Sequence, residues 1–332
     1  MKTLLFKYFH QIIILSSLLG VTFLIISCAP NIISGNVIRE ETAKNPEAYF
    51  CPEEDCGKVL EKNIASANIS VHCAFYDINL QNVINALAAK SKSVDVKVVI
   101  DSSNQRGQIK GNALREDNNN QLMHNKFCSI DGKIITTGSF NPTFNDNSRN
   151  NNNLIVIHSK NLAGNYNEEF NELWNRKFGK GEKVKNPVVY VNGIEMQNYF
   201  CPEDKCASRI AKEIKSARRS VYFMTFTFTN KDIADSLIGK KEIDIKGIFD
   251  AGQAGSNFSQ LERLSGLGMN VKKDTNKYKM HHKVFIIDNK TVVTGSFNPT
   301  ASAENKNDEN IIIIKDKVIA GSFLKEFDGL WG

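Results

Sequence analysis

An internal repeat restricts the folds that this chain of 332 residues can adopt. The sequence YFCPEEDC at residues 49–56 returns as YFCPEDKC at residues 199–206, an offset of 150 positions. Trp174 and Trp331 correspond at an offset of 157, so most of the difference is an insertion within residues 250–281 of the second copy. Because each copy spans about 140 residues, it is long enough to bury its own core. The chain is therefore predicted to fold as two versions of one unit.

Both copies show the same order of apolar patterns. The first copy has helix-like segments at 52–67 and 82–89, β-rich runs at 69–76, 94–100, 126–130, 134–138 and 154–157, and a final helix that ends at Trp174. The second copy has helix-like segments at 202–217 and 231–237, β-rich runs at 221–228, 243–249, 283–287, 291–295 and 311–314, and a final helix that ends at Trp331. This alternation predicts two α/β sandwich domains, each a mixed sheet flanked by helices, at 46–185 and 186–332.

The first 45 residues differ in kind from the repeats. Lys2 and Lys7 precede an uncharged apolar stretch that ends in Ile-Ile-Ser-Cys28, which is typical of a secretory signal and resembles a bacterial lipobox. Residues 1–28 are therefore predicted to be a lipoprotein signal with Cys28 as the lipidated residue, and the polar residues 29–45 a linker. A transmembrane anchor is the alternative, because the apolar stretch approaches the ~20 residues that span a bilayer. In either case the repeats are expected outside the cytoplasm, in the cell envelope, and attached to a membrane.

The cysteines point to an oxidising compartment. With Cys28 assigned to lipid, six of the seven cysteines remain, an even number. Cys51 with Cys56, and Cys201 with Cys206, share one spacing, and a proline takes the first predicted helical position after the first cysteine of each pair. Two local disulfides are the favoured interpretation. Reduced packing cysteines are an alternative, and a zinc site is disfavoured because neither pair has further ligands at metal spacing.

Two further cysteines occupy positions that are aromatic in the other copy. Cys73 and Cys128 align with Phe223 and Phe285. Because both copies place apolar or soft side chains there, Cys73 and Cys128 are expected in the buried core rather than in a third bridge.

A shorter motif recurs inside the repeat with every fixed position intact. It contains His124, Lys126, Asp131, Ser139 and Asn141 in the first copy, and His281, Lys283, Asp288, Ser296 and Asn298 in the second. Residues i and i+2 of a strand face the same side, so each histidine projects together with its lysine. The glycine before each motif serine permits a tight turn that brings serine and asparagine beside the imidazole. Because histidine titrates near neutral pH, two such nucleophiles beside fixed cations indicate phosphate chemistry at one shared site.

The motif HxKx4Dx6GSxN is the signature of the phospholipase D superfamily, and this chain resembles that family over residues 46–332. The compact repeat is similar to the small bacterial nucleases and mitochondrial cardiolipin hydrolases, which work as dimers of one unit. The resemblance implies a monomer that contains a fused pseudo-dimer with pseudo-twofold symmetry. It also implies a phosphohistidine intermediate, lysines and asparagines that hold the phosphate oxygens, structural roles for Asp131 and Asp288, and no metal or cofactor.

The resemblance also predicts that the two halves differ. Glu309 follows His281 by 28 residues, where nuclease-like members carry an acidic residue that orients a catalytic histidine. The aligned residue of the first half is Asn152. One histidine should therefore have a carboxylate partner and the other a neutral one, which separates their pKa values. By analogy with two-repeat members, His124 is predicted as the nucleophile and His281 as the general acid.

The substrate is predicted less closely than the chemistry. A net charge of +6 suits a polyanion such as nucleic acid or an anionic lipid surface. The compact repeats favour an endonuclease slightly, whereas the membrane anchor favours a phospholipase D that degrades lipids; phosphatidyl transfer, as in cardiolipin synthesis, is a third possibility. Basic residues alternate with an aromatic one at Lys272, Lys273, Lys277, Tyr278 and Lys279, a pattern that suits a nucleic-acid strand or anionic headgroups.

Overall fold

The computed structural model describes residues 40–104, 107, 109, 111–118 and 120–332. The predicted signal and the lipidation site at Cys28 lie outside these residues. Within the described ranges, no helix combines the length and the apolar character needed to cross a bilayer.

The first repeat forms a seven-stranded mixed sheet in the order β2-β8-β7-β6-β3-β4-β5. Its strands are β2 (Glu47–Cys51), β3 (Ser70–Phe75), β4 (Asp95–Ile100), β5 (Leu114–Glu116), β6 (Lys126–Ile130), β7 (Ile134–Gly138) and β8 (Asn152–His158). Its helices are α2 (Cys56–Ala65), α3 (Gln81–Lys90), α4 (Phe144–Ser148) and α5 (Lys160–Trp174). The strands β3, β4 and β5 run parallel, and the other neighbours run antiparallel.

The second repeat forms a nine-stranded sheet whose order is β1-β9-β10-β16-β15-β14-β11-β12-β13. Its strands are β1 (Glu40–Glu41), β9 (Val188–Val191), β10 (Ile194–Cys201), β11 (Ser220–Thr225), β12 (Asp244–Phe249), β13 (Asn270–Lys273), β14 (Lys283–Ile287), β15 (Thr291–Gly295) and β16 (Glu309–Lys315). Its helices are α6 (Cys206–Ser216), α7 (Lys231–Ile238), α8 (Leu261–Gly266), α9 (Ala301–Asn305) and α10 (Lys317–Trp331). The part of this sheet that runs β10-β16-β15-β14-β11-β12-β13 has the same strand order as the first sheet, so the predicted fold class is confirmed.

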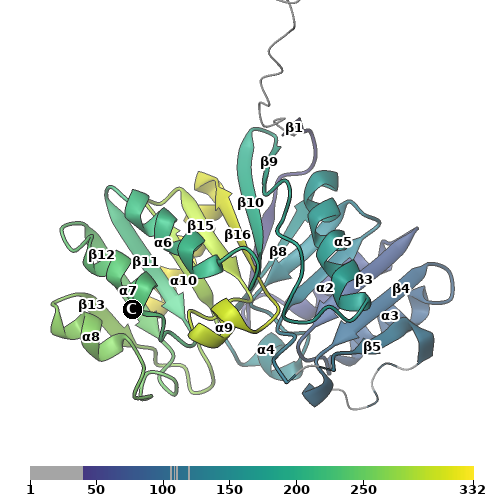
Figure 1. The fold of residues 1–332 in the computed structure, drawn as a ribbon, viewed down its shortest axis with the longest axis horizontal. Coiled ribbons are helices and arrows are strands. Elements are labelled where there is room, and N and C mark those ends of the chain that lie inside the picture. The colour runs from purple at the N-terminus through teal and green to yellow at the C-terminus, as the bar shows by residue number, and fades with distance from the viewer. Residues whose placement is uncertain (1–39, 105–106, 108, 110, 119) are drawn as a thin grey trace, which may run out of the picture. The chain divides into compact units, whose positions relative to one another are not determined.

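A shared core joins the two repeats. One cluster of buried side chains combines Ile155 and Phe170 of the first repeat with Phe200, Ile312 and Phe323 of the second. Helix α5 packs on its own sheet and contacts β10, whereas α10 packs on the second sheet and contacts β2. Figure 1 shows the two sheets meeting where β8 and β16 lie. The repeats are therefore halves of one compact unit rather than two separate domains.

The segment predicted as the end of the linker is part of the fold. Glu40 and Glu41 form β1, which pairs in parallel with Tyr190 and Val191 of β9. The side chain of Asn192 also bonds the backbone of Ala43 in both directions. The described residues of the linker therefore join the second sheet, although the chain continues from them into the first repeat. Residues 29–39 of the predicted linker lie outside the described part.

The two helices that follow the local cysteine pairs begin later in the sequence than predicted. The helices start at Cys56 and Cys206, not at the prolines, because the residues before each second cysteine form a turn that follows a cis Cys-Pro bond. Glu54 N–H donates to the Phe50 carbonyl at 2.7 Å in the first of these turns. Disulfides join Cys51 to Cys56 and Cys201 to Cys206, as the spacing indicates.

The expectation of two unbridged core cysteines in the first repeat was wrong. Cys73 and Cys128 are both buried, and a disulfide joins them. They lie directly opposite each other in the antiparallel pair β3 and β6, with their Cα atoms 4.1 Å apart. The second repeat places Phe223 and Phe285 at the same cross-strand position. Alignment with the aromatic pair indicated burial correctly but concealed the cross-strand pairing.

Candidate active site

The motif histidines lie at the junction of the two repeats, each immediately before a strand. His124 precedes β6, and its N–H donates to the carbonyl of Asp308 at 2.9 Å. His281 precedes β14, and its N–H donates to the carbonyl of Asn151 at 2.9 Å. Each histidine backbone is therefore fixed by the other repeat. These two reciprocal hydrogen bonds bring both histidines into one site, as the repeated motif predicts.

His124 pairs with the carboxylate of Glu309 from the other half. The two side chains meet at 2.8 Å between Nδ1 and Oε2, and Glu309 is fully buried. The Ser296 hydroxyl donates to the same carboxylate oxygen at 2.6 Å. Burial would raise the pKa of Glu309, but His124 and Lys126 outweigh it, so this pKa lies below its ordinary value. Burial lowers the pKa of His124, and the negative charge of Glu309 opposes that change.

His281 has a neutral partner at the corresponding position. Its Nδ1 meets the amide oxygen of Asn152 at 2.8 Å. Asp146 also faces this nitrogen, at 3.5 Å from its Oδ2. Burial, followed by the positive charges of Lys283 and Lys126, holds the pKa of His281 well below its ordinary value. The two histidines therefore have different surroundings, as the contrast between Glu309 and Asn152 suggests.

Each motif lysine lies beside the histidine of its own motif, and the two settings are nearly equivalent. The ammonium of Lys126 donates to the carbonyl of His124, and that of Lys283 to the carbonyl of His281, each at 2.6 Å. Burial lowers the pKa of Lys126 to about 8 and holds the pKa of Lys283 well below its ordinary value. Two buried cations at one site can hold the oxygens of a phosphodiester as charge develops.

Each lysine also lies over an aromatic ring that packs against the histidine. Tyr76 lies 4.8 Å from the His124 ring and 5.0 Å from the Lys126 ammonium. Phe226 lies 4.9 Å from the His281 ring and 5.0 Å from the Lys283 ammonium. The sequence reasoning missed both rings. Their equivalent positions at the ends of the β-rich runs 69–76 and 221–228 were the available signal.

The two motif asparagines are not equivalent. Asn141 donates from its Nδ2 to Asp146 at 2.7 Å, which fixes its amide. Ala303 replaces this aspartate in the second repeat, and no acidic side chain within the described residues fixes the amide of Asn298. The amide oxygens of both asparagines are buried without a hydrogen-bond partner in the described part of the chain. Asp146 itself was not predicted, because nothing in the second repeat marks its position.

Asp131 and Asp288 lie away from the histidines, at the far ends of the motif strands. Asp131 accepts the backbone N–H groups of Asn68, Ile69 and Ser70 at 2.8–3.1 Å. Asp288 accepts those of residues 218–220 in the same way. Burial alone would raise the pKa of each carboxyl, but these donors lower it below its ordinary value. The geometry is that of a structural residue that joins strand ends.

The motif serines connect the site to the next strand. Ser139 Oγ accepts the N–H of Asn153 at 3.0 Å, and Ser296 Oγ accepts the N–H of Asn310 at 2.9 Å. The glycine before each serine has φ of 141° or 147°, and a Cβ there would collide with the carbonyl of Asn153 or Asn310. Gly138 and Gly295 therefore allow this close approach.

The side chains of Asn125 and His282, which lie between the histidine and the lysine of each motif, face the interface of the repeats. Asn125 accepts from Asn310 at 2.7 Å, and His282 meets Asn153 at 3.3 Å. These contacts cross from one half to the other. The alternation of β6 and β14 thus divides the motif between chemistry on one face and assembly on the other.

A stack of exposed aromatic and basic side chains lies beside the second motif. The Arg149 guanidinium lies 5.0 Å from the Phe144 ring and 5.1 Å from the Tyr278 ring. Lys279 lies over Phe226, the ring that contacts His281. We call Phe144, Arg149, Tyr278 and Lys279 the rim. Lys272, which the sequence pattern grouped with these residues, instead contacts Trp331 at the edge strand β13.

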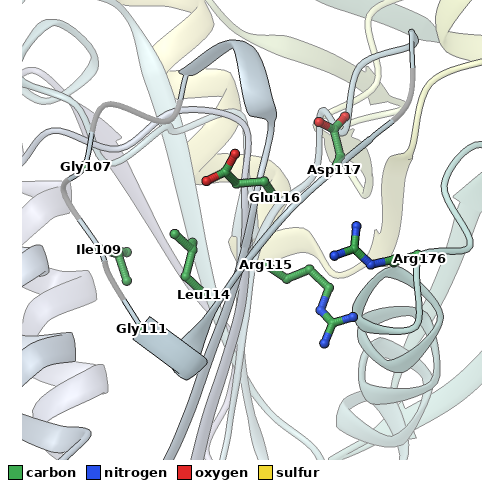
Figure 2. Close-up of a pocket in the computed structure, with 8 residues that line it drawn as sticks. All are labelled: Gly107, Ile109, Gly111, Leu114, Arg115, Glu116, Asp117 and Arg176. Carbon is green, nitrogen blue, oxygen red and sulfur yellow. The ribbon is translucent and has the colours of Figure 1, made fainter.

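A pocket of about 710 Å³ lies in the first repeat, and none of the motif residues lines it. Figure 2 shows Arg115 and Arg176 on one side of it and Ile109 and Leu114 on the other. Arg115 is already engaged, because its guanidinium lies 4.6 Å from the Trp174 ring. The chemistry therefore resides at the histidine junction rather than in this pocket.

Comparisons with known proteins agree with this geometry. The family model described as cardiolipin synthase, PLD-like domain, matches residues 60–174 and 210–331. A mitochondrial cardiolipin hydrolase of Xenopus laevis is 33% identical over 152 residues, which cover 44% of this chain and 72% of that protein. A phospholipase D of Rickettsia bellii is 35% identical over 148 residues, which cover 44% of this chain and 74% of that protein. The structure of phosphatidylserine synthase from Haemophilus influenzae shares the fold, with a TM-score of 0.67, 12% identity and 88% of each chain covered.

Proposed function

The chain belongs to the family of PLD-like domains and is a phosphodiester hydrolase, and we propose that it cleaves single-stranded nucleic acid at the site that its two repeats share. The observation that carries this choice of substrate is the rim of Phe144, Arg149, Tyr278 and Lys279. One chain supplies both histidines, so the proposal includes action as a monomer.

The proposed reaction proceeds in two displacements. With Nδ1 held by Glu309, the Nε2 atom of His124 is the free nucleophile. It bonds to phosphorus while the bond from phosphorus to the leaving oxygen breaks, and His281 gives that oxygen a proton. Water then attacks the phosphohistidine, His281 takes the proton from the water, and the bond to His124 breaks. Lys126 and Lys283 hold the phosphate oxygens throughout.

The rim favours nucleic acid because its chemistry suits a base and a phosphate. Phe144 is 54% exposed and Tyr278 48% exposed, so their rings are accessible for stacking. Stacking of a base on an aromatic ring contributes about 1–3 kcal/mol and tolerates any sequence. Arg149 contacts both rings, and its positive charge attracts the phosphates of a nucleic-acid backbone.

The described chain begins at β1, at a distance from the site. Strand β1 lies beside Val191, and β10 runs from Ile194 at that end to Cys201, which pairs with Glu309 at the site. At about 3.3 Å per residue, the seven steps of β10 separate the entry from the site by about 23 Å. Figure 1 shows β1 and β9 at one end and α4 and α9 at the other.

The proposed location is the cell envelope, outside the cytoplasm. Three disulfides in the described residues support an oxidising compartment. Mass spectrometry of protein from its native envelope should find an acylated Cys28 and both local cysteine pairs oxidised. An intact, unmodified leader would favour the transmembrane anchor instead.

Phospholipid cleavage is the second candidate function. It is favoured by relatives that are named phospholipase D and cardiolipin hydrolase. Phosphatidyl transfer is a variant of the same chemistry in which an alcohol replaces water.

In the test, the full chain in detergent is incubated with single-stranded DNA, with plasmid and with mixed phospholipid vesicles. We expect cleavage of the single strand, and a several-fold loss of affinity for it in Arg149→Ala and Tyr278→Ala. Lys306→Ala is the matched control, because Lys306 aligns with Arg149 in the second repeat and is also exposed. Headgroup release from vesicles without DNA cleavage would replace the nucleic-acid proposal with the lipid one.

A further inference from the structure

The first repeat lacks a carboxylate where the second has Glu309, but it has another one nearby. Asn152 takes the aligned position, and Asp146 lies six residues earlier, in α4. The residue that aligns with Asp146 in α9 is Ala303, which is also buried. Each half therefore brings one carboxylate to the motif histidine of the other half. The two carboxylates come from different positions in the repeat.

The contacts of Asp146 are those of a fixed, buried side chain. It is 4% exposed, and its Oδ1 accepts from Asn150 at 2.6 Å. Its Oδ2 accepts the N–H and the Nδ2 of Asn141 at 3.0 Å and 2.7 Å. The same oxygen faces Nδ1 of His281 at 3.5 Å. One carboxylate oxygen thus contacts a motif asparagine and the histidine of the other repeat.

We infer that Asp146 is a positioning residue for His281 and supplies, from α4, the negative charge that the first repeat lacks at position 152. Asn152 fixes the direction of the His281 ring through its 2.8 Å contact, and Asp146 supports the charge of that ring. In the second repeat Glu309 performs both tasks for His124. The inference rests on the proposed role of His281 as general acid, but it does not depend on which phosphodiester is the substrate.

The charges around His281 explain why this carboxylate matters. Lys283 from β14, Lys126 from β6, His124 and Lys279 all oppose a proton on His281. Asp146 is the acidic side chain in ion-pair range of it within the described residues. A general acid must carry a proton before it can donate one. Asp146 and the bound phosphodiester anion together favour that protonated form against the neighbouring cations.

The test compares two substrates that differ in their need for an acid. Bis(4-nitrophenyl) phosphate loses a weakly basic phenolate that needs little protonation, whereas diphenyl phosphate loses a more basic one. Asp146→Asn should lower kcat/KM for diphenyl phosphate about tenfold or more and change that for the nitrophenyl ester much less. The basic limb of the pH profile with diphenyl phosphate should move to lower pH by about one unit or more.

Two further variants separate positioning from folding. Ser148→Ala, on the exposed face of the same short helix, should leave both rates unchanged. Asp146→Asn combined with Asn152→Glu returns a carboxylate to the position that Glu309 has in the second repeat, and should restore the ratio of the two rates.

The inference is overturned if folded Asp146→Asn keeps the wild-type ratio and pH profile. It is equally overturned if the double variant folds but keeps a lowered ratio. Should Asp146→Asn fail to fold, the double variant decides the question by its own ratio.

Discussion

The two repeats share their backbone and differ in the side chains that meet at the site. Both sheets place the two motif strands directly beside the parallel strands, and each histidine donates its backbone N–H to a carbonyl of the opposite half. Yet Glu309 faces one histidine, and Asn152 with Asp146 faces the other. The comparison teaches that a duplicated scaffold can divide two chemical roles by a few substitutions near one symmetric centre.

The largest expected effect comes from either histidine. His124→Asn and His281→Asn should each lower turnover by about 10²–10⁴-fold, because the two groups act in sequence on one phosphate. Stopped-flow or steady-state assays measure the loss. His124→Asn should also abolish the phosphoenzyme, whereas His281→Asn should still label His124 with an activated ester. If each single variant kept half the wild-type rate, the two halves would have independent sites.

The next effect concerns the bridge Cys73–Cys128, where the second half has the pair Phe223 and Phe285 instead. Cys73–Cys128 closes a loop with a sequence separation of 55, whereas Cys51–Cys56 closes one of 5. Loop-closure entropy gives the long bridge about 4 kcal/mol of stabilisation and the short one about 2 kcal/mol. Denaturant unfolding of Cys73→Ala/Cys128→Ala should therefore show the larger loss, with Cys51→Ala/Cys56→Ala as the matched control. Equal losses would mean that strand pairing already restrains the long loop.

A smaller effect should be the same in both halves. Asp131→Asn and Asp288→Asn each weaken three backbone hydrogen bonds, and each should lower the free energy of unfolding by about 1–3 kcal/mol. The folded pKa of both carboxyls is depressed, so their stabilising effect is present above the unfolded pKa near 3.9 and is lost as pH falls through the folded value. Urea titrations at pH 7 and at low pH test this. A loss confined to one half would contradict the structural equivalence of the two aspartates.

The smallest expected effect is that of a chelator. Lys126 and Lys283 lie beside the motif histidines, where their ammonium groups can hold the reacting phosphate, so excess EDTA should leave the rate unchanged. The assay is a progress curve with and without EDTA. Inhibition that a divalent ion reverses would show that the lysines do not suffice.

Residues whose role follows from chain periodicity were predictable, and those whose role follows from tertiary contact were not. The alternation of β6 placed His124 with Lys126 correctly on one face. The spacing of Glu309 could not indicate that it contacts His124 rather than His281, because that contact forms only where the two folded halves meet. Asp146 had no counterpart in the second repeat from which it could be recognised.

The strands before the first helix of each repeat illustrate the same limit. Segments 47–51 and 194–201 form β2 and β10, but the sequence predicted no strand before the helix-like segments at 52–67 and 202–217. Their pairing partners β8 and β16 lie about 100 residues further along the chain, and a local pattern does not contain that information. The Cys73–Cys128 bridge escaped prediction for a related reason, since cross-strand register is a property of the folded sheet.

The exchanged backbone bonds between the repeats have a consequence for the life of the protein before it is fully folded. Because His124 is held by Asp308 and His281 by Asn151, a half that has folded alone lacks the contacts that orient its own histidine. Partly synthesised or partly folded chains should therefore be inert towards the phosphodiesters around them. We expect activity to appear only once both halves have assembled.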